Sequence, residues 1–228
     1  LKAKYDEFIP KTGINSICKF LIDEKDLLVN TKIIKAQNSN NKWFLEDEHH
    51  KIYEDFDLLF ITIPAPQILE MQIELQDDFK QKLSHIKYDS VFSLILYSNE
   101  NLKLDEKKIY ENVDVSDIIN NSKKYLYKDF SSYIIHSTKE FANCLNHKNK
   151  DEIYELFLEN FEEELQDELK NFTTIAHFWK YANAKNSLDM PYFLNKEKNL
   201  GICGDYFNHN NMEATLSSSE LLGNVKFD

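Results

Sequence analysis

The sequence predicts an α+β fold built on a mixed β-sheet. Short apolar runs of strand length, broken by turn residues, fill much of the first 136 residues, and two later segments show the spacing of amphipathic helices. No internal repeat or low-complexity linker interrupts the pattern. With 228 residues, 42% of them hydrophobic and 13% aromatic, the chain can bury the core of one large domain or two small ones.

The N-terminal region is expected to hold one short helix and then strands. A turn at residues 8–13 precedes apolar residues at helical spacing over residues 14–22, which predicts a short amphipathic helix. Three apolar runs of strand length follow, at residues 26–30, 32–36 and 42–45. The polar residues 38–41 predict a hairpin turn between the last two strands.

The most continuous apolar run covers residues 56–64, as expected of a strand that is covered on both faces. Pro64 and Pro66 end it, so we interpret it as a central strand that leads into a crossover. Weaker helical spacing predicts a helix over residues 68–83. Further strands are predicted at residues 90–98 and twice within residues 113–136, most clearly at 132–136.

Residues 151–170 give the clearest helix signal in the chain. The apolar residues that share one helical face are Ile153, Leu156, Phe157, Phe161, Leu165 and Leu169. Acidic residues fill the opposite face, which is most simply a solvated surface, although a basic partner could dock there. The remaining elements predicted are a strand, a hairpin and a closing helix, at residues 173–181, 192–194 with 200–203, and 212–225.

The charge of the chain argues against nucleic acid as a partner. The formal net charge is -12 at pH 7, and the acidic residues crowd into residues 151–168 instead of a basic patch interleaved with aromatics. All 27 positively charged side chains are lysines, which fits the codon bias of an AT-rich genome. Any anion bound here is therefore held by point charges and backbone N–H groups, not by a guanidinium fork.

The cysteines and histidines predict no metal site. Cys18, Cys144 and Cys203 are far apart and form no CxxC pair, which suggests a reduced, cytoplasmic compartment. His49 and His50 lie among acidic residues, but adjacent side chains in a strand point to opposite faces, so a solvated acidic loop is the simpler interpretation. The longest apolar runs are too short to span a bilayer, so we expect no membrane interaction.

The C-terminal unit carries the most functional information. Its apolar strand ends in Gly204 and Asp205, and a polar loop then leads to a helix that starts at Met212. The unpaired first-turn N–H groups of such a helix carry a partial positive charge, which suits a phosphate or a reduced flavin. Gly204 would allow close backbone approach, and Asp205 would accept hydrogen bonds from sugar-like hydroxyls. An ordinary β-turn-α unit with Asp205 as a turn residue accounts for the same pattern.

Other motifs stand in a fixed order along the chain. Residues 177–182 read His-Phe-Trp-Lys-Tyr-Ala, and the apolar strand from residue 57 ends in Pro-Ala-Pro-Gln. Residues 10–15 form a helix entry with Pro and Gly, and residues 133–137 form a strand before the acidic helix. Together with the Gly-Asp unit, these motifs resemble those of the renalase-like FAD-dependent oxidoreductases of the amine oxidase superfamily. The resemblance spans nearly all 228 residues in collinear order.

The resemblance implies that FAD is the cofactor. Gly204 and Asp205 would contact its ribityl and pyrophosphate portion, and Met212, Glu213 and Ala214 would begin the helix that faces the isoalloxazine ring. In this family a hydride passes to the flavin from a small-molecule substrate or from NAD(P)H, so the cofactor carries the reaction. The resemblance assigns no catalytic acid or base.

Upstream positions receive roles from the same resemblance. The backbone at Ile33 or Ile34 would face the adenine, and Pro64 and Ala65 would line the adenosine side. The residues implied for the wall of the substrate pocket near the ring are Trp179, Tyr181 and His177.

Two features depart from the family pattern. The family has small residues after the helix-starting Glu, where this chain has Thr215 and Ser219. The dinucleotide fingerprint GxGxxG needs three glycines within six residues, whereas the glycines of this chain are Gly13, Gly201, Gly204 and Gly223. Because the chain also opens at Leu1, within what reads as a polar connector, we expect a fragment whose phosphate loop lies before Leu1 or on a separate N-terminal polypeptide.

These expectations divide the chain into two domains. Residues 1–66 and 196–228 would form part of a discontinuous, Rossmann-like FAD-binding domain, and residues 67–195 a substrate-binding domain with a mixed or antiparallel sheet. Two alternatives to the oxidoreductase stay open. One is a catalytically inactive remnant that acts as a binding or assembly module. The other is an unrelated α+β protein that binds a small ligand, in which the strands before Pro64 and before Gly204 would lie in separate sheets.

Overall fold

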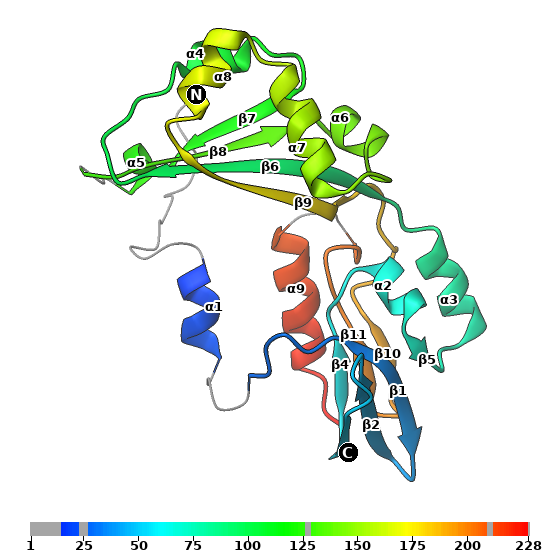
Figure 1. Ribbon diagram of the computed structural model, residues 1–228. Coiled ribbons are helices and arrows are strands. Elements are labelled where there is room, and N and C mark those ends of the chain that lie inside the picture. The colour runs from blue at the N-terminus through cyan, green and yellow to red at the C-terminus, as the bar shows by residue number, and fades with distance from the viewer. Residues whose placement is uncertain (1–14, 23–26, 126–128, 209–211, 228) are drawn as a thin grey trace. The chain divides into compact units, whose positions relative to one another are not determined.

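The described residues form helices and three β-sheets, which agrees with the predicted α+β class (Figure 1). This computed structural model describes residues 15–22, 27–125, 129–208 and 212–227. The strands of the first sheet, in spatial order, are β3 (Ile52–Phe56), β2 (Lys42–Asp47), β1 (Ile33–Ser39) and β5 (Gln72–Ile73). The second sheet has the order β10 (Phe193–Asn195), β11 (Leu200–Ile202) and β4 (Leu59–Ile61). The third has the order β7 (Val115–Asn120), β8 (Ser131–Ser137), β6 (Tyr88–Ser98) and β9 (Thr173–Ala184).

The chain packs as two compact units. One comprises residues 1–30, 93–136 and 154–177, and the other comprises residues 31–92, 137–153 and 178–228. These units are defined by packing rather than by ligands, and their limits differ from the ranges predicted for the cofactor and substrate domains. The assignment of residues 1–66 and 196–228 to FAD, and of 67–195 to substrate, therefore stays a prediction.

In the first unit, strands β6 and β8 form an antiparallel pair whose register runs from Ser93 opposite His136 to Ser98 opposite Ser131. Both strands were expected from their apolar runs, and Leu94, Leu96 and Ile135 are fully buried. The helices that begin within this unit are α1 (Asn15–Leu21), α4 (Glu106–Tyr110), α5 (Asn121–Lys124) and α8 (Glu163–Leu169). Helix α1 confirms the predicted N-terminal helix, but none of its residues is buried.

The predicted helix over residues 151–170 is two helices, α7 (Lys150–Glu159) and α8. The break lies at Asn160, whose side chain donates to Asp114 Oδ2 at 2.7 Å and whose carbonyl accepts from the Asn112 side chain at 2.8 Å. These tertiary bonds hold the bend, which local helical spacing does not reveal. The predicted apolar face is nevertheless correct, because Phe157 and Leu165 on either side of the break are buried.

In the second unit, strands β1 and β2 form the predicted hairpin. Ser39 pairs with Lys42, and the two residues between them, Asn40 and Asn41, have φ angles of 53° and 61°. A two-residue turn with positive φ at both positions matches the right-handed twist of the strands, and Asn tolerates that conformation. The buried Trp43 then donates its indole N–H to the carbonyl of Lys198 at 2.8 Å, which ties the hairpin to the β10–β11 turn.

The predicted single strand over residues 56–64 is wrong. Strand β3 ends at Phe56 in one sheet, the backbone bends at Asp57, and residues 59–61 form β4 in another sheet. Strand β4 lies at the edge of its sheet in the described part of the chain, and Phe60 is 43% exposed. It is therefore not a central strand covered on both faces.

Two further predictions need correction. Residues 27–30 form no strand, and Leu28 is 62% exposed; residue 26 lies outside the described residues. An apolar run becomes a strand only where another strand pairs with it. The predicted helix over residues 68–83 is replaced by α2 (Ala65–Glu70), β5 and α3 (Asp77–Ser84), because Gln72 and Ile73 pair in parallel with β1.

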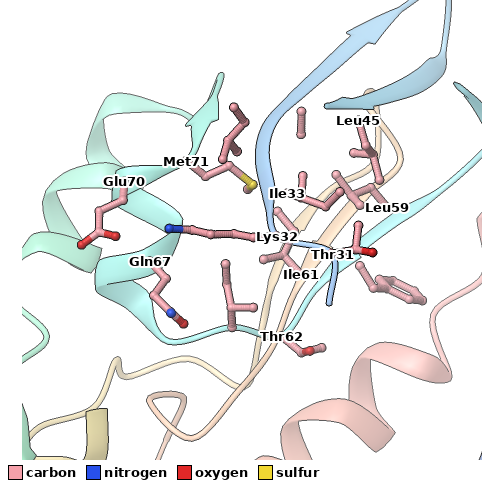
Figure 2. A pocket seen from close by; sticks show the side chains of 14 residues that line it. Thr31, Lys32, Ile33, Leu45, Leu59, Ile61, Thr62, Gln67, Glu70 and Met71 are labelled. Carbon is pink, nitrogen blue, oxygen red and sulfur yellow. The ribbon is translucent and has the colours of Figure 1, made fainter. Parts of the chain in front are cut away.

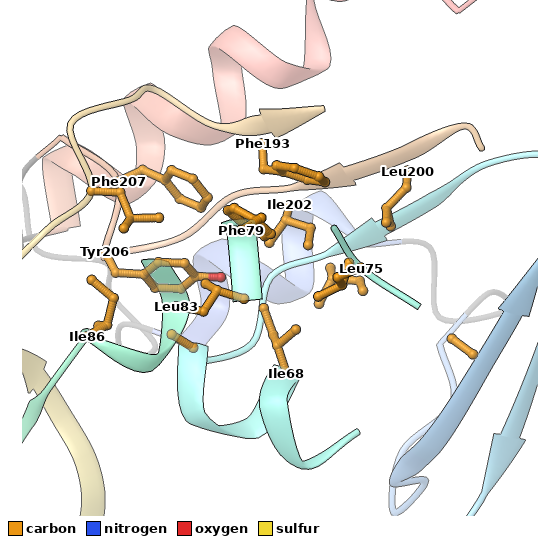
Figure 3. Packing of buried hydrophobic residues seen from close by; sticks show 14 of the residues in the cluster. Ile68, Leu75, Phe79, Leu83, Ile86, Phe193, Leu200, Ile202, Tyr206 and Phe207 are labelled. Atoms are coloured by element: carbon orange, nitrogen blue, oxygen red, sulfur yellow. The ribbon is translucent and has the colours of Figure 1, made fainter. Parts of the chain in front are cut away.

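The β10-β11-β4 sheet has a helix against each face. On one side, Leu200 and Ile202 join a buried cluster with residues of α2 and α3, in which Phe79 stacks on Phe193 with ring centroids 3.8 Å apart (Figure 3). On the other side, a Cβ at Gly201 would lie 2.6 Å from the Phe60 ring and 2.9 Å from Leu222 of α9 (Met212–Gly223). Glycine is therefore required where strand, ring and helix meet. The predicted hairpin and closing helix are both confirmed.

Candidate cofactor corner

Strands β4 and β11 run in parallel, so both carboxyl ends reach the same edge of the sheet. Leu59 to Ile61 pair with Leu200 to Ile202, and the N–H of Cys203 donates to the carbonyl of Ile61 at 3.1 Å. The strands that precede Pro64 and Gly204 thus belong to one sheet. This is the opposite of what the unrelated ligand-binding alternative requires, and in open α/β sheets ligands bind at such an edge.

A tyrosine hydroxyl connects the two predicted cofactor segments. Tyr88, the first residue of β6, donates its hydroxyl to Asp205 Oδ1 at 2.9 Å. The backbone N–H of Ala65, the first residue of α2, partly offsets the rise in the pKa of this hydroxyl. The structure thereby brings together Ala65 and Asp205, which are far apart in sequence. We call Ala65, Tyr88 and Asp205 the cofactor corner.

A second tyrosine closes the cofactor corner from the opposite direction. Tyr206 is completely buried, and its hydroxyl donates to the carbonyl of Ile63 at 3.3 Å. A Cβ at the buried Gly204 would lie 2.9 Å from the Tyr206 ring, so glycine leaves room for that ring. Gly204 thus allows close packing of protein against protein, whereas the sequence suggested close approach to a ligand.

Burial raises the pKa of Tyr88 and of Tyr206, which keeps both hydroxyls protonated. Desolvation, with the nearby Asp205 charge and its hydrogen bond, raises the pKa of Tyr88 far above its usual value. Desolvation also raises the pKa of Tyr206 well above the ordinary tyrosine value. The Tyr88 hydroxyl is therefore a permanent donor toward Asp205. Burial likewise raises the pKa of the Cys203 thiol, which makes that residue a packing group rather than a nucleophile.

A cavity of about 570 Å³ lies beside β4 and β1 in the same unit (Figure 2). Its walls are mostly apolar and include Ile33, Leu59 and Ile61, and Figure 2 shows the Lys32 side chain extending across it toward Gln67 and Glu70. The volume falls in the range of small-molecule sites, about 300–1,000 Å³. Ile33, expected to face the adenine, therefore lines a pocket of suitable size.

The predicted substrate-pocket residues lie on one face of β9, where alternate residues share a face. His177 is exposed and Trp179 is 51% exposed. Tyr181 is half-buried, donates to Glu70 Oε1 at 3.5 Å and packs edge-on against Tyr88, with ring centroids 5.5 Å apart. Tyr181 is thus joined by these contacts to the cofactor corner.

The start of α9 is described in part. The side chain of Met212 and the loop residues 209–211 lie outside the described residues, Glu213 is exposed and Ala214 is buried. The expectation that the first N–H groups of α9 face a flavin therefore stays a prediction. Thr215 is half-buried, and the exposed Ser219 donates its hydroxyl to the carbonyl of Leu216 at 2.9 Å, one turn earlier in the helix.

The histidine pair belongs to a turn organised by Asp47. The buried Asp47 carboxylate accepts from the N–H groups of His49 and Lys51 and from the Tyr53 hydroxyl. Desolvation opposes ionisation, but these donors outweigh it and lower the pKa of Asp47. His50 instead bonds Glu46 at 2.6 Å. Among the residues that the structure describes, no cluster of His, Cys, Asp and Glu could hold a metal ion.

Comparison with known proteins agrees with the motifs. No family model matches the chain. Renalase from Mus musculus is 25% identical over 93% of this chain, which spans 66% of that protein's length. The chain is similar in sequence to renalase along most of its length. The resemblance expected from the collinear motifs is therefore confirmed.

Solved structures extend this likeness to the fold. A protein from Exiguobacterium described as a protoporphyrinogen oxidase matches 93% of this chain and 51% of its own, with a TM-score of 0.59 and 10% identity. Putrescine oxidase bound to putrescine matches 93% of this chain and 53% of its own, with a TM-score of 0.57 and 8% identity. At such identities these structures support the shared fold alone. Within the described residues, no helix is long and apolar enough to cross a bilayer.

Proposed function

We propose that this chain is part of an FAD-dependent oxidoreductase in which a hydride passes to the flavin from a small-molecule substrate or from NAD(P)H. The observation that carries the proposal is the parallel β4–β11 pair, whose carboxyl ends bring Ala65 and Asp205 to one corner in a chain similar in sequence to renalase. FAD, when bound, supplies the hydride acceptor, and the residues of this chain bind and orient it.

The residues present fit two parts of FAD. The apolar cavity with Ile33 in its wall suits a flat adenine ring. Asp205 uses Oδ1 for Tyr88, and no interaction among the described residues engages its other oxygen, Oδ2, which can accept a bond from a ribityl hydroxyl. In the proposal, Pro64 and Ala65 lie on the adenosine side, and Gly204 with the start of α9 lies on the ribityl and ring side.

This sequence has no glycine-rich loop of the kind that usually binds the pyrophosphate of FAD. The four glycines are too far apart for a GxGxxG loop, and the chain has no arginine. We propose that a segment outside these 228 residues, or a separate N-terminal polypeptide, supplies the loop and packs beside strand β4, at the edge of the β10-β11-β4 sheet. The exposure of Phe60 (43%) and Ile63 (37%) next to the cavity supports that position. Residues 1–66 and 196–228 would then complete a discontinuous Rossmann-like domain.

The test is FAD binding by the intact gene product. We expect it to purify with flavin absorbance, or to take up added FAD with quenched flavin fluorescence. Asp205→Ala should weaken binding by about tenfold or more, because a carboxylate acceptor is lost. The matched control is Asp189→Ala, an exposed carboxylate in the same unit. A folded, colourless protein that takes up no FAD contradicts the proposal.

The glycine pattern also favours a second candidate, an inactive remnant that acts as a binding or assembly module. A remnant predicts no FAD uptake and no neighbouring reading frame that encodes a strand followed by GxGxxG. The oxidoreductase predicts FAD uptake, with the fingerprint supplied by the same gene or an adjacent one. The two candidates are thus separated by the titration above and by the sequence upstream of the chain.

A further inference from the structure

The Tyr88 hydroxyl is oriented by its bond to Asp205. A tyrosine hydroxyl has one proton to donate. Here that proton is donated to Asp205 Oδ1 at 2.9 Å. Because Asp205 is half-buried at the end of a strand, this bond restricts the rotation of its carboxylate. A hydrogen bond to an ionised carboxylate is also stronger than one between two neutral groups.

The Tyr88 ring is fixed as well. It packs edge-on against Tyr181 at 5.5 Å and 70°, and both rings line a surface groove of about 350 Å³ together with Pro66 and Lys180. Tyr88 therefore contacts a residue expected at the substrate wall and two residues expected at the cofactor. Motif comparison assigned it no role, because it precedes the apolar run that marked the strand.

We propose that Tyr88 is a positioning residue that holds the Asp205 carboxylate in place, so that Asp205 Oδ2 is directed to a ribityl hydroxyl of FAD. This inference rests on the proposed function. Tyr88 touches neither cofactor nor reacting atoms in this assignment and acts through Asp205. Its loss changes how tightly the ribityl chain is held, not the chemistry of the flavin itself.

Tyr206 provides a matched control. It is a buried tyrosine next to the cofactor corner that likewise donates its hydroxyl, but its partner is the Ile63 carbonyl. Tyr88→Phe and Tyr206→Phe each remove one hydroxyl and retain the ring. A role in packing alone predicts the same outcome for both variants, namely lower stability with unchanged FAD affinity.

The experiment measures the FAD dissociation constant of the intact gene product by flavin fluorescence, together with its thermal melting. We expect Tyr88→Phe to raise the dissociation constant about tenfold, as for a lost charge-assisted hydrogen bond, and Tyr206→Phe to change it less than about threefold. The effects of Tyr88→Phe and Asp205→Asn should not add in the double variant, because both remove the same contact.

Wild-type affinity in Tyr88→Phe, or additivity in the double variant, overturns the inference, and in these cases the proposed function stands if the wild type binds FAD. If the wild type binds no FAD, the proposed function itself is wrong, and the role of Tyr88 is rejected with it.

Discussion

The β10-β11-β4 sheet and strand β9 of the β7-β8-β6-β9 sheet bury their side chains differently. Leu200 and Ile202 are buried under α2 and α3, and Gly201 lies against Phe60 and Leu222 on the other face. On β9, by contrast, Ile175 and Trp179 are half-exposed. Close packing on both faces can hold a bound group's partners rigidly in place, whereas an open face can admit different molecules. The contrast agrees with the proposal of a rigid cofactor corner and a substrate wall on β9.

The largest effect on stability is expected for Gly201→Ala. The added Cβ would meet the Phe60 ring at 2.6 Å and Leu222 at 2.9 Å, so strand, ring or helix must move. Overpacking of this kind costs about 1–3 kcal/mol, which urea unfolding measures. Gly223→Ala is the control, because a Cβ added there would have no neighbour within 4 Å and stability should change by less than about 0.5 kcal/mol. Equal effects of the two variants would mean that the sheet is not tightly covered.

A smaller, pH-dependent effect on stability is expected at His136, on strand β8 of the β7-β8-β6-β9 sheet. Its Nδ1 lies 2.8 Å from the buried Ser93 hydroxyl, and burial lowers the pKa of His136 against a weaker opposing effect of Asp117. The folded protein therefore resists protonation of this residue. Its contribution to stability is present above the unfolded pKa, about 6.5, and is lost as the pH falls through the lower folded value.

The measurement is the free energy of unfolding of the wild type and of His136→Gln from neutral to mildly acidic pH. Acidic residues elsewhere contribute equally to both proteins, so the difference isolates His136. The wild type should lose more stability than the variant as the pH drops below about 6.5. Parallel curves would show that the imidazole titrates alike in the folded and unfolded chains.

The smallest effect on stability is expected for Trp179→Ala. Because Trp179 is 51% exposed on β9, its removal should change the free energy of unfolding by no more than about 0.5 kcal/mol. If the proposed substrate wall is correct, kcat/KM of the intact gene product should nevertheless fall at least about tenfold. Ile175→Ala, at 50% exposure on the same face, is the control and should alter neither quantity much. Normal turnover in Trp179→Ala would remove this residue from the substrate wall.

Local patterns in the sequence were reliable where a short segment determines its own conformation. The Asn40-Asn41 turn fixes a hairpin, and helical spacing identified the buried face that contains Phe157 and Leu165 despite the break at Asn160. Predictions were wrong where distant pairing decides the outcome. Residues 56–64 divide between two sheets, and residues 72–73 leave a helical pattern to pair with β1.

The candidate site shows the same division. The Gly-Asp and Pro-Ala motifs could be found in the sequence because each is contiguous, and with them came the family resemblance. Tyr88 could not be found, because its role depends on a hydrogen bond to a residue 117 positions away. Nothing in the spacing of one chain indicates that a hydroxyl on β6 meets the ends of β4 and β11.

The amino-acid sequence by itself determined the α+β composition, the hairpins, the missing dinucleotide fingerprint and the likeness to flavoproteins, because these depend on neighbouring residues or on motif order. The tertiary structure alone decided that β4 and β11 share a sheet and that Tyr88 on β6 bonds Asp205. Strand pairing and side-chain hydrogen bonds depend on which distant segments meet, and that is settled only when the whole chain packs.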